Sequence, residues 1–140
     1  MTALVVDASV WVGAADGSDT FSVSSRGFLA ELAARSLAIE MPALARVEVA
    51  CALARRLRDG ERARQLTEVM LRSPLITLHA MDAALVDTAV VEGTRAFLRA
   101  ADAVYAALAA RIGGTIVTWD EDLLRRAGGV TPIAWLEENR

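Results

Sequence analysis

Short apolar runs alternate along this chain with longer segments whose apolar residues recur at helical spacing. Residues 3–6 form a continuous apolar run, which is typical of a strand buried on both faces. Residues 21–35 instead place Phe28, Leu29 and Leu32 three to four positions apart, and this spacing predicts a helix. The alternation of the two patterns predicts an α/β fold with a parallel sheet covered by helices.

Proline and glycine mark the boundaries of the other predicted elements. Pro42 suits the first turn of a helix, because the N–H that proline lacks would be unpaired there anyway. Gly113 and Gly114 end a later helix. The remaining strands are predicted near residues 37–40, 75–78, 115–118 and 131–133. The remaining helices are predicted directly after Asp7 and near residues 42–58, 61–71, 82–92, 102–111 and 121–127.

The length and composition favour one globular domain spanning residues 1–140. The chain has 140 residues, of which 54% are hydrophobic, and this is enough for one core. No charge-free run approaches the ~18 apolar residues of a membrane span. Asp7 interrupts the first apolar run and no basic segment precedes it, which argues against a secretory signal. The single cysteine, Cys51, fits a reducing compartment, so we expect a cytoplasmic protein.

The charged residues exclude several enzyme classes. All 15 basic residues are arginine, so chemistry that needs a lysine is excluded, including that of P-loops, Schiff-base enzymes and receiver domains. A haloacid-dehalogenase phosphatase needs Asp-x-Asp after its first strand, but Ser9 takes the second position. The net charge of −3 does not by itself indicate a nucleic-acid partner.

Three aspartates lie at predicted element ends. Asp7 follows the first strand and Asp120 follows the strand near 115–118, at the sheet edge where open α/β folds bind ligands. Asp102 opens a predicted helix, whose free N–H groups favour a carboxylate. Each of these aspartates could instead be an ordinary helix cap, and Asp122 is a further candidate in the turn after Asp120. None of them identifies a site alone.

Glu48 is harder to explain as a structural residue. Its neighbours three and four positions away in the predicted helix are all apolar: Leu44, Ala45, Cys51 and Ala52. A glutamate on such a surface either reaches water at a rim or points into a pocket, since an unpaired buried carboxylate costs several kcal/mol or becomes protonated. No arginine lies at those spacings to pair with it. This pattern favours a functional role.

A site formed by all four carboxylates would need a cation, because like charges a few Å apart cannot all stay ionised alone. Oxygen ligands favour Mg²⁺ or Mn²⁺, and the lone His79 and Cys51 offer no zinc set. A hard cation held there activates water and neutralises charge on a phosphate. The residues therefore point to metal-dependent phosphodiester hydrolysis with Asp7, Glu48, Asp102 and Asp120 as metal ligands and catalytic groups.

Four short motifs together resemble the PIN-domain nucleases, and within them the VapC-type toxins of toxin–antitoxin pairs. Besides Glu48, they are Val5-Val6-Asp7-Ala8-Ser9, Ala101-Asp102-Ala103-Val104-Tyr105, and Gly114-Thr115-Ile116-Val117-Thr118-Trp119-Asp120. The resemblance implies a three-layer α/β/α sandwich and Mg²⁺- or Mn²⁺-dependent cleavage of RNA. It also implies Ser9 and Thr118 as supporting hydroxyls, to which we add Asp122, with a cognate antitoxin and a homodimer as partners.

Several interpretations stay open. A PIN domain can process RNA without being a toxin, and a PIN-like scaffold can bind RNA or protein without cutting. Arg95, Arg99 and the arginines of residues 55–64 are candidates to hold an RNA backbone, although a solvated helix face explains most of them as well. Trp119 is bulky beside the proposed site and either packs there or stacks on a base. Apolar residues of the early helices, such as Trp11, Val12 and Phe28, either bind an antitoxin or belong to the core.

Overall fold

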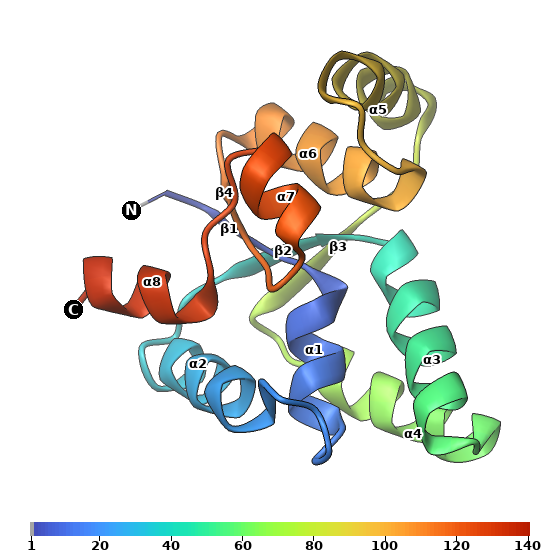
Figure 1. Cartoon of the computed structure of the whole chain (residues 1–140), viewed down its shortest axis with the longest axis vertical. Helices are drawn as coiled ribbons and strands as arrows, with labels where there is room; N and C mark the ends of the chain where they lie inside the picture. The colour runs from blue at the N-terminus through green and yellow to red at the C-terminus, as the bar shows by residue number, and fades with distance from the viewer. Residues whose placement is uncertain (1) are drawn as a thin grey trace.

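A four-stranded parallel sheet forms the centre of the computed structural model, which describes residues 2–140 (Figure 1). The strand order is β3-β2-β1-β4, with β1 paired to β2 and to β4. Leu4 of β1 is in register with Ile39 of β2 and Thr115 of β4. The strands are β1 (Leu4–Val6), β2 (Ile39–Pro42), β3 (Ile76–His79) and β4 (Thr115–Val117).

Helices lie on both faces of this sheet. Figure 1 shows α5 and α6 on one side, α1, α2 and α8 on the other, and α3 and α4 as a pair that extends to the side. The helices are α1 (Ala8–Ala15), α2 (Ser22–Ala34), α3 (Leu44–Leu57), α4 (Gly60–Leu71), α5 (Ala83–Ala96), α6 (Ala100–Ile112), α7 (Glu121–Arg126) and α8 (Pro132–Glu138). This arrangement confirms the predicted α/β/α sandwich.

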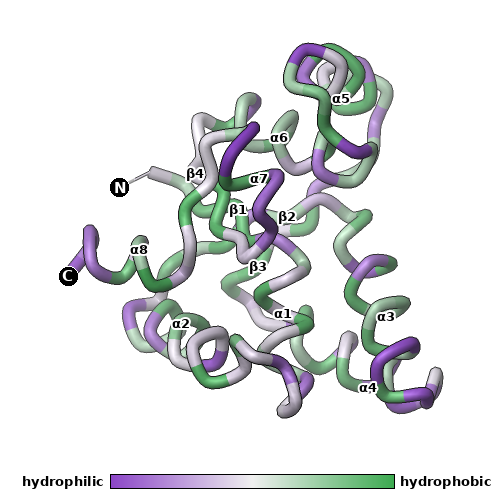
Figure 2. The backbone as a smooth tube through the Cα atoms, in the orientation of Figure 1, coloured by the Kyte–Doolittle hydropathy of each residue, from purple (hydrophilic) through white to green (hydrophobic). Residues whose placement is uncertain are grey.

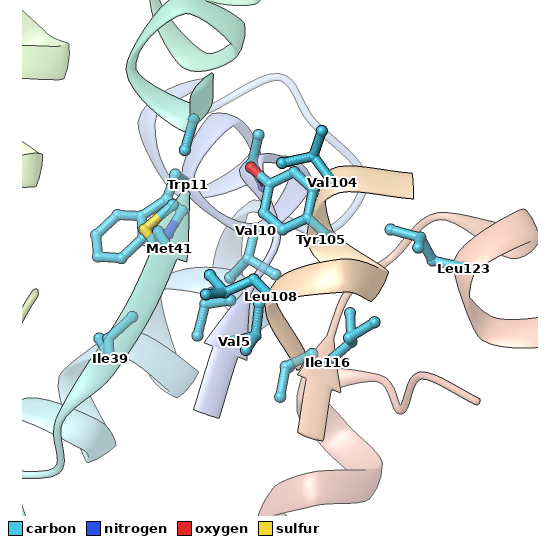
Figure 3. Packing of buried hydrophobic residues seen from close by; sticks show 14 of the residues in the cluster. Val5, Val10, Trp11, Ile39, Met41, Val104, Tyr105, Leu108, Ile116 and Leu123 are labelled. Atoms are coloured by element: carbon cyan, nitrogen blue, oxygen red, sulfur yellow. Dashed lines mark hydrogen bonds between the residues drawn. The ribbon is translucent and has the colours of Figure 1, made fainter. Parts of the chain in front are cut away.

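The core lies on both faces of β1. Figure 3 shows Leu108 of α6 beside Val5, with Val10 and Trp11 of α1 nearby. Hydrophobic residues follow the central strands in Figure 2, whereas α7 is largely hydrophilic. The three apolar residues considered for antitoxin binding are all core residues, with exposures of 5% for Trp11, 4% for Val12 and 0% for Phe28. None of them offers a surface to a partner.

One predicted helix start and one predicted strand were wrong. Pro42 does not begin a helix: it ends β2, in register with His79, and α3 begins at Leu44. The strand predicted near residues 131–133 is the start of α8, because Thr131 caps that helix by accepting a hydrogen bond from the Ala134 N–H. Only Val130 makes a sheet contact there, as an isolated bridge to Val117.

The packing of α5 against α6 depends on Gly93. A Cβ atom at this position would lie 2.7 Å from the Cβ of Ala103, so the two helices could not keep their distance. We expect Gly93→Ala to lower the free energy of unfolding by about 1–3 kcal/mol, even though alanine is the better helix former. Urea unfolding measures this change.

Gly27 of α2 is the matched control, because a Cβ atom there meets nothing within 4 Å. Gly27→Ala should raise the free energy of unfolding by about 0.5–1 kcal/mol. A stabilising effect of Gly93→Ala as well would show that close α5–α6 contact is not required.

No helix within residues 2–140 has the length and apolar character to cross a membrane.

Candidate active site

Two of the predicted aspartates lie side by side because of the strand order. The chain runs from β1 through β2 to β3 on one side of the sheet and then crosses to β4 on the other. Parallel sheets bind ligands where the order changes direction in this way, outside the carboxyl ends of the strands. Asp7 directly follows β1, and Asp120 lies shortly after the neighbouring β4. The fold therefore places both carboxylates at this switch point.

Both aspartates are also helix caps. Asp7 Oδ2 accepts a hydrogen bond from the Ser9 N–H at 3.3 Å. Asp120 Oδ1 accepts from the N–H groups of Asp122 and Leu123 at 2.9 and 3.2 Å. The capping interpretation is thus right for each, but the cap of Asp120 uses only Oδ1, and its Oδ2 accepts a hydrogen bond from Arg99 at 2.7 Å. A cap at this edge of the sheet can serve both purposes.

Thr118 links the two aspartates. Its hydroxyl donates to Asp7 Oδ2 at 2.8 Å and accepts from the Asp120 N–H at 2.9 Å. The Ser9 hydroxyl lies 3.3 Å from that of Thr118 and accepts from the Trp119 N–H at 3.0 Å. Asp7 is 6% exposed and Thr118 is fully buried, so this network holds the Asp7 carboxylate in one orientation.

Asp102 comes from α6 and is not the helix cap that we expected. The helix begins at Ala100 after Arg99 as N-cap, and Asp102 lies in the first turn with 8% of its surface exposed. An oxygen from each of Asp102, Asp120 and Asp122 lies within 4.8 Å of the others, a separation that suits one shared cation. Asp7 and Glu48 contribute no oxygen to this group of three.

Glu48 has the most unusual environment in the site. It projects from α3, and its Oε1 is buried without a hydrogen-bond partner among the described residues. Burial raises the pKa of Glu48 to about 7, and the charges of Asp7 and Asp102 act in the same direction. Only the neighbouring Tyr105 hydroxyl lowers it. The apolar helical neighbours had pointed to this environment.

Burial is also the main cause that raises the pKa values of Asp7 and Asp102, and repulsion from Asp120 adds to both. Arg99 opposes the effect at Asp102. The site thus gathers more negative charge than its own residues neutralise. A hard divalent cation fits this set of donors, since every candidate ligand is a carboxylate oxygen.

Tyr105 is a site residue whose role the sequence did not reveal. Its ring is fully buried among the core residues (Figure 3). Its hydroxyl accepts a hydrogen bond from the N–H of Ala8, the residue after Asp7, at 3.2 Å. Burial raises the pKa of Tyr105, and the charges of Asp7 and Glu48 raise it further. The hydroxyl therefore stays protonated. One sequence feature could have identified it: Tyr105 is the only tyrosine of the chain and lies one turn after Asp102 in a helix of small residues.

Trp119 is half-buried and packs against α2 and the residue before it. Its ring stacks on Phe21 with centroids 4.1 Å apart, and its Nε1–H donates to the Ser25 hydroxyl at 2.9 Å. Among the arginines proposed to hold a nucleic-acid backbone, Arg56 is paired with Asp16 and Asp19. Arg99 lies at the acidic site itself.

The parallel sheet with an acidic group at its switch point defines an α/β protein with a candidate site for a hard cation. The family model of the PIN domain matches residues 4–129, and the chain belongs to this family. Comparison with curated protein sequences finds no match.

Several solved structures share this fold. VapC20 of Mycobacterium tuberculosis, described as a Sarcin-Ricin loop cleaving toxin, has 20% identity and a TM-score of 0.76, over 93% of this chain and 98% of that one. A toxin–antitoxin complex from Klebsiella pneumoniae has 17% identity and a TM-score of 0.66, over 94% and 98%. FitAcB from Neisseria gonorrhoeae has 18% identity and a TM-score of 0.69, over 93% and 98%. At these identities the likeness establishes the fold.

Proposed function

We propose that this protein is an Mg²⁺-dependent endoribonuclease that acts as the toxin of a toxin–antitoxin pair. The observation that carries the proposal is the acidic group at the switch point of the sheet, with oxygens of Asp102, Asp120 and Asp122 within 4.8 Å of one another. Asp7 lies close enough to this group for its charge to raise the pKa of Asp102, and the charges of Asp7 and Asp102 raise the pKa of Glu48. Such an excess of carboxylates is typical of a site for Mg²⁺.

Asp102 and Asp120 would hold the ion, with Asp122 in support and with Asp7 and Glu48 completing the acidic set. Mg²⁺ supplies Lewis-acid activation of water and neutralises charge on the phosphate, and Mn²⁺ can replace it. Thr118 and Ser9 keep Asp7 in position through the hydrogen bonds described above. Glu48, whose carboxylate is close enough to Asp7 and Asp102 for their charges to act on it, would accept a proton from the attacking water.

The proposed substrate and partner follow from the relatives. VapC20 is described as cleaving the Sarcin-Ricin loop, which supports RNA as the substrate class here. The Klebsiella structure is a toxin–antitoxin complex, which supports a cognate antitoxin as the partner. We also propose a homodimer and assign it to α5, where Val86, Val90 and Phe97 are 45, 59 and 81% exposed.

The protein should cleave a labelled single-stranded RNA in the presence of millimolar Mg²⁺ and should be inactive in EDTA. Mg²⁺ should also raise the melting temperature by about 3–6 °C, since an ion that binds only the folded state stabilises it. Differential scanning calorimetry and gel electrophoresis of the RNA products measure the two effects. If Mg²⁺ neither stabilises the protein nor supports RNA cleavage at any concentration, the result would favour the scaffold interpretation instead.

A PIN-domain enzyme that processes RNA without a toxin role is the closest alternative, and it would use the same site. The two are separated by the genomic neighbourhood and by growth. A small adjacent reading frame for a DNA-binding protein, together with growth arrest on induction of this chain alone, would support the toxin role. Normal growth while RNA is cleaved would support the processing role.

A further inference from the structure

The guanidinium of Arg99 lies among the three carboxylates that would hold the ion. Its Nη2 is 2.7 Å from an oxygen of Asp120, 3.1 Å from one of Asp102 and 3.7 Å from one of Asp122. Its Nε also donates to Asp102 at 3.2 Å. One nitrogen therefore faces all members of the group whose oxygens lie within 4.8 Å of one another.

A metal ion and this guanidinium cannot occupy the group together. Mg²⁺ binds its oxygen ligands at about 2.0–2.1 Å and Mn²⁺ prefers the same hard donors, so an ion shared by these carboxylates would lie where Nη2 now makes its contacts. The two cations would also repel each other strongly at such a separation. Binding of the ion thus requires the Arg99 side chain to leave.

The position of Arg99 in the fold allows it to leave without disturbing the site. Arg99 is the N-cap residue of α6, and its side chain is 65% exposed. It makes no side-chain cap hydrogen bond to the helix, so the start of α6 does not depend on where the guanidinium lies. The long flexible side chain can turn into solvent while Asp102 and Asp120 stay in place.

We propose that Arg99 is a built-in counterion that neutralises the acidic group in the metal-free protein and competes with the metal for it. The inference rests on the proposed function, because it presumes a metal at this group. In the metal-free state Arg99 reduces the repulsion among Asp102, Asp120 and Asp122. On metal loading it is displaced to the rim of the site, where its freed charge faces the substrate side.

Arg99→Gln tests this competition through metal binding alone, without RNA. The Kd for Mn²⁺ is measured by electron paramagnetic resonance of the free ion. It should fall about fivefold or more relative to the wild type, because the weak exposed ion pairs of Arg99 no longer have to be broken. The melting temperature in EDTA should fall as well. Arg99→Lys, which keeps the charge but not the planar fork, should give an intermediate Kd.

Arg125→Gln is the matched control, since it removes the same charge near the same group. Arg125 Nη2 lies 3.0 Å from Asp122 Oδ1, whereas Arg99 faces the other oxygen of that residue. Equal tightening in both variants would show a general charge effect and would overturn the competition. An unchanged or weaker affinity of Arg99→Gln would also overturn it. A wild type and variants that all fail to bind Mn²⁺ would contradict the proposed function itself.

Discussion

Asp102→Asn is expected to reduce Mg²⁺-dependent RNA cleavage by about 10³-fold or more while the protein stays folded. Asparagine keeps the shape of the side chain but removes a charge from the group that Asp102 forms with Asp120 and Asp122. Because burial and repulsion raise the pKa of Asp102, its charge does not stabilise the metal-free fold. The initial rate of RNA cleavage at saturating Mg²⁺ measures the loss.

Asp87→Asn provides the control for this prediction. Asp87 is exposed on α5 and is not a member of the acidic group, so its replacement should leave the rate unchanged. Circular dichroism of both variants reports whether the fold is intact. Full activity of a folded Asp102→Asn protein would rule out the proposed site. Asp7→Asn is expected to lose RNA cleavage in the same way as Asp102→Asn.

Glu48→Gln is expected to stabilise the metal-free protein at pH 8 and to reduce cleavage by about 100-fold. The ordinary pKa of this side chain is 4.5, and in the folded protein it is about 7. Between these values the native state keeps a proton that the unfolded chain has released. The free energy of unfolding of the wild type therefore falls as pH rises through this window.

Glutamine has no such dependence, so the difference between variant and wild type should grow from pH 4.5 to 7 and then level off. Above pH 7 the variant should be more stable by about 1–3 kcal/mol, with allowance for partial solvent screening. Urea unfolding in EDTA at a series of pH values measures this difference. Saturating Mg²⁺ should reverse the order, because the ion stabilises the ionised glutamate.

Glu137→Gln is the matched control, since Glu137 is exposed on α8. Its replacement should change the free energy of unfolding by less than about 0.5 kcal/mol at every pH. A parallel pH dependence of wild type and Glu48→Gln would show that Glu48 is ionised and solvated in the folded protein. Such a result would contradict the buried environment described above for Glu48.

Local patterns were sufficient for most elements but not for their ends. The run at residues 3–6 and the helical spacing at 21–35 correspond to β1 and α2. Pro42 was misplaced because proline is compatible both with a first helical turn and with the end of a strand, and only pairing with His79 distinguishes them. The strand predicted near residues 131–133 failed because Thr131 and Pro132 are also strong signals for a helix start.

The candidate site shows the same division between local and tertiary information. Glu48 could be singled out because its helical neighbours are apolar, which is a property of the chain within one turn. Arg99 could be named only as one of several arginines, since its contacts with Asp120 and Asp122 join segments 21 residues or more apart in sequence. The close approach of Gly93 to Ala103 has no signal in either helix alone.

The type of most secondary-structure elements and the presence of an acidic residue at several element ends were set by the order of residues along the chain. Apolar runs and caps act through interactions within a few positions, so they can be read locally. The strand order β3-β2-β1-β4 was decided only by the packed structure. That order sets β1 beside β4 and brings Asp120 next to Asp7. It also lets α6 carry Asp102 and Arg99 to the same edge of the sheet. The physical reason is that both faces of a parallel sheet are buried only when all the strands and their covering helices have packed together.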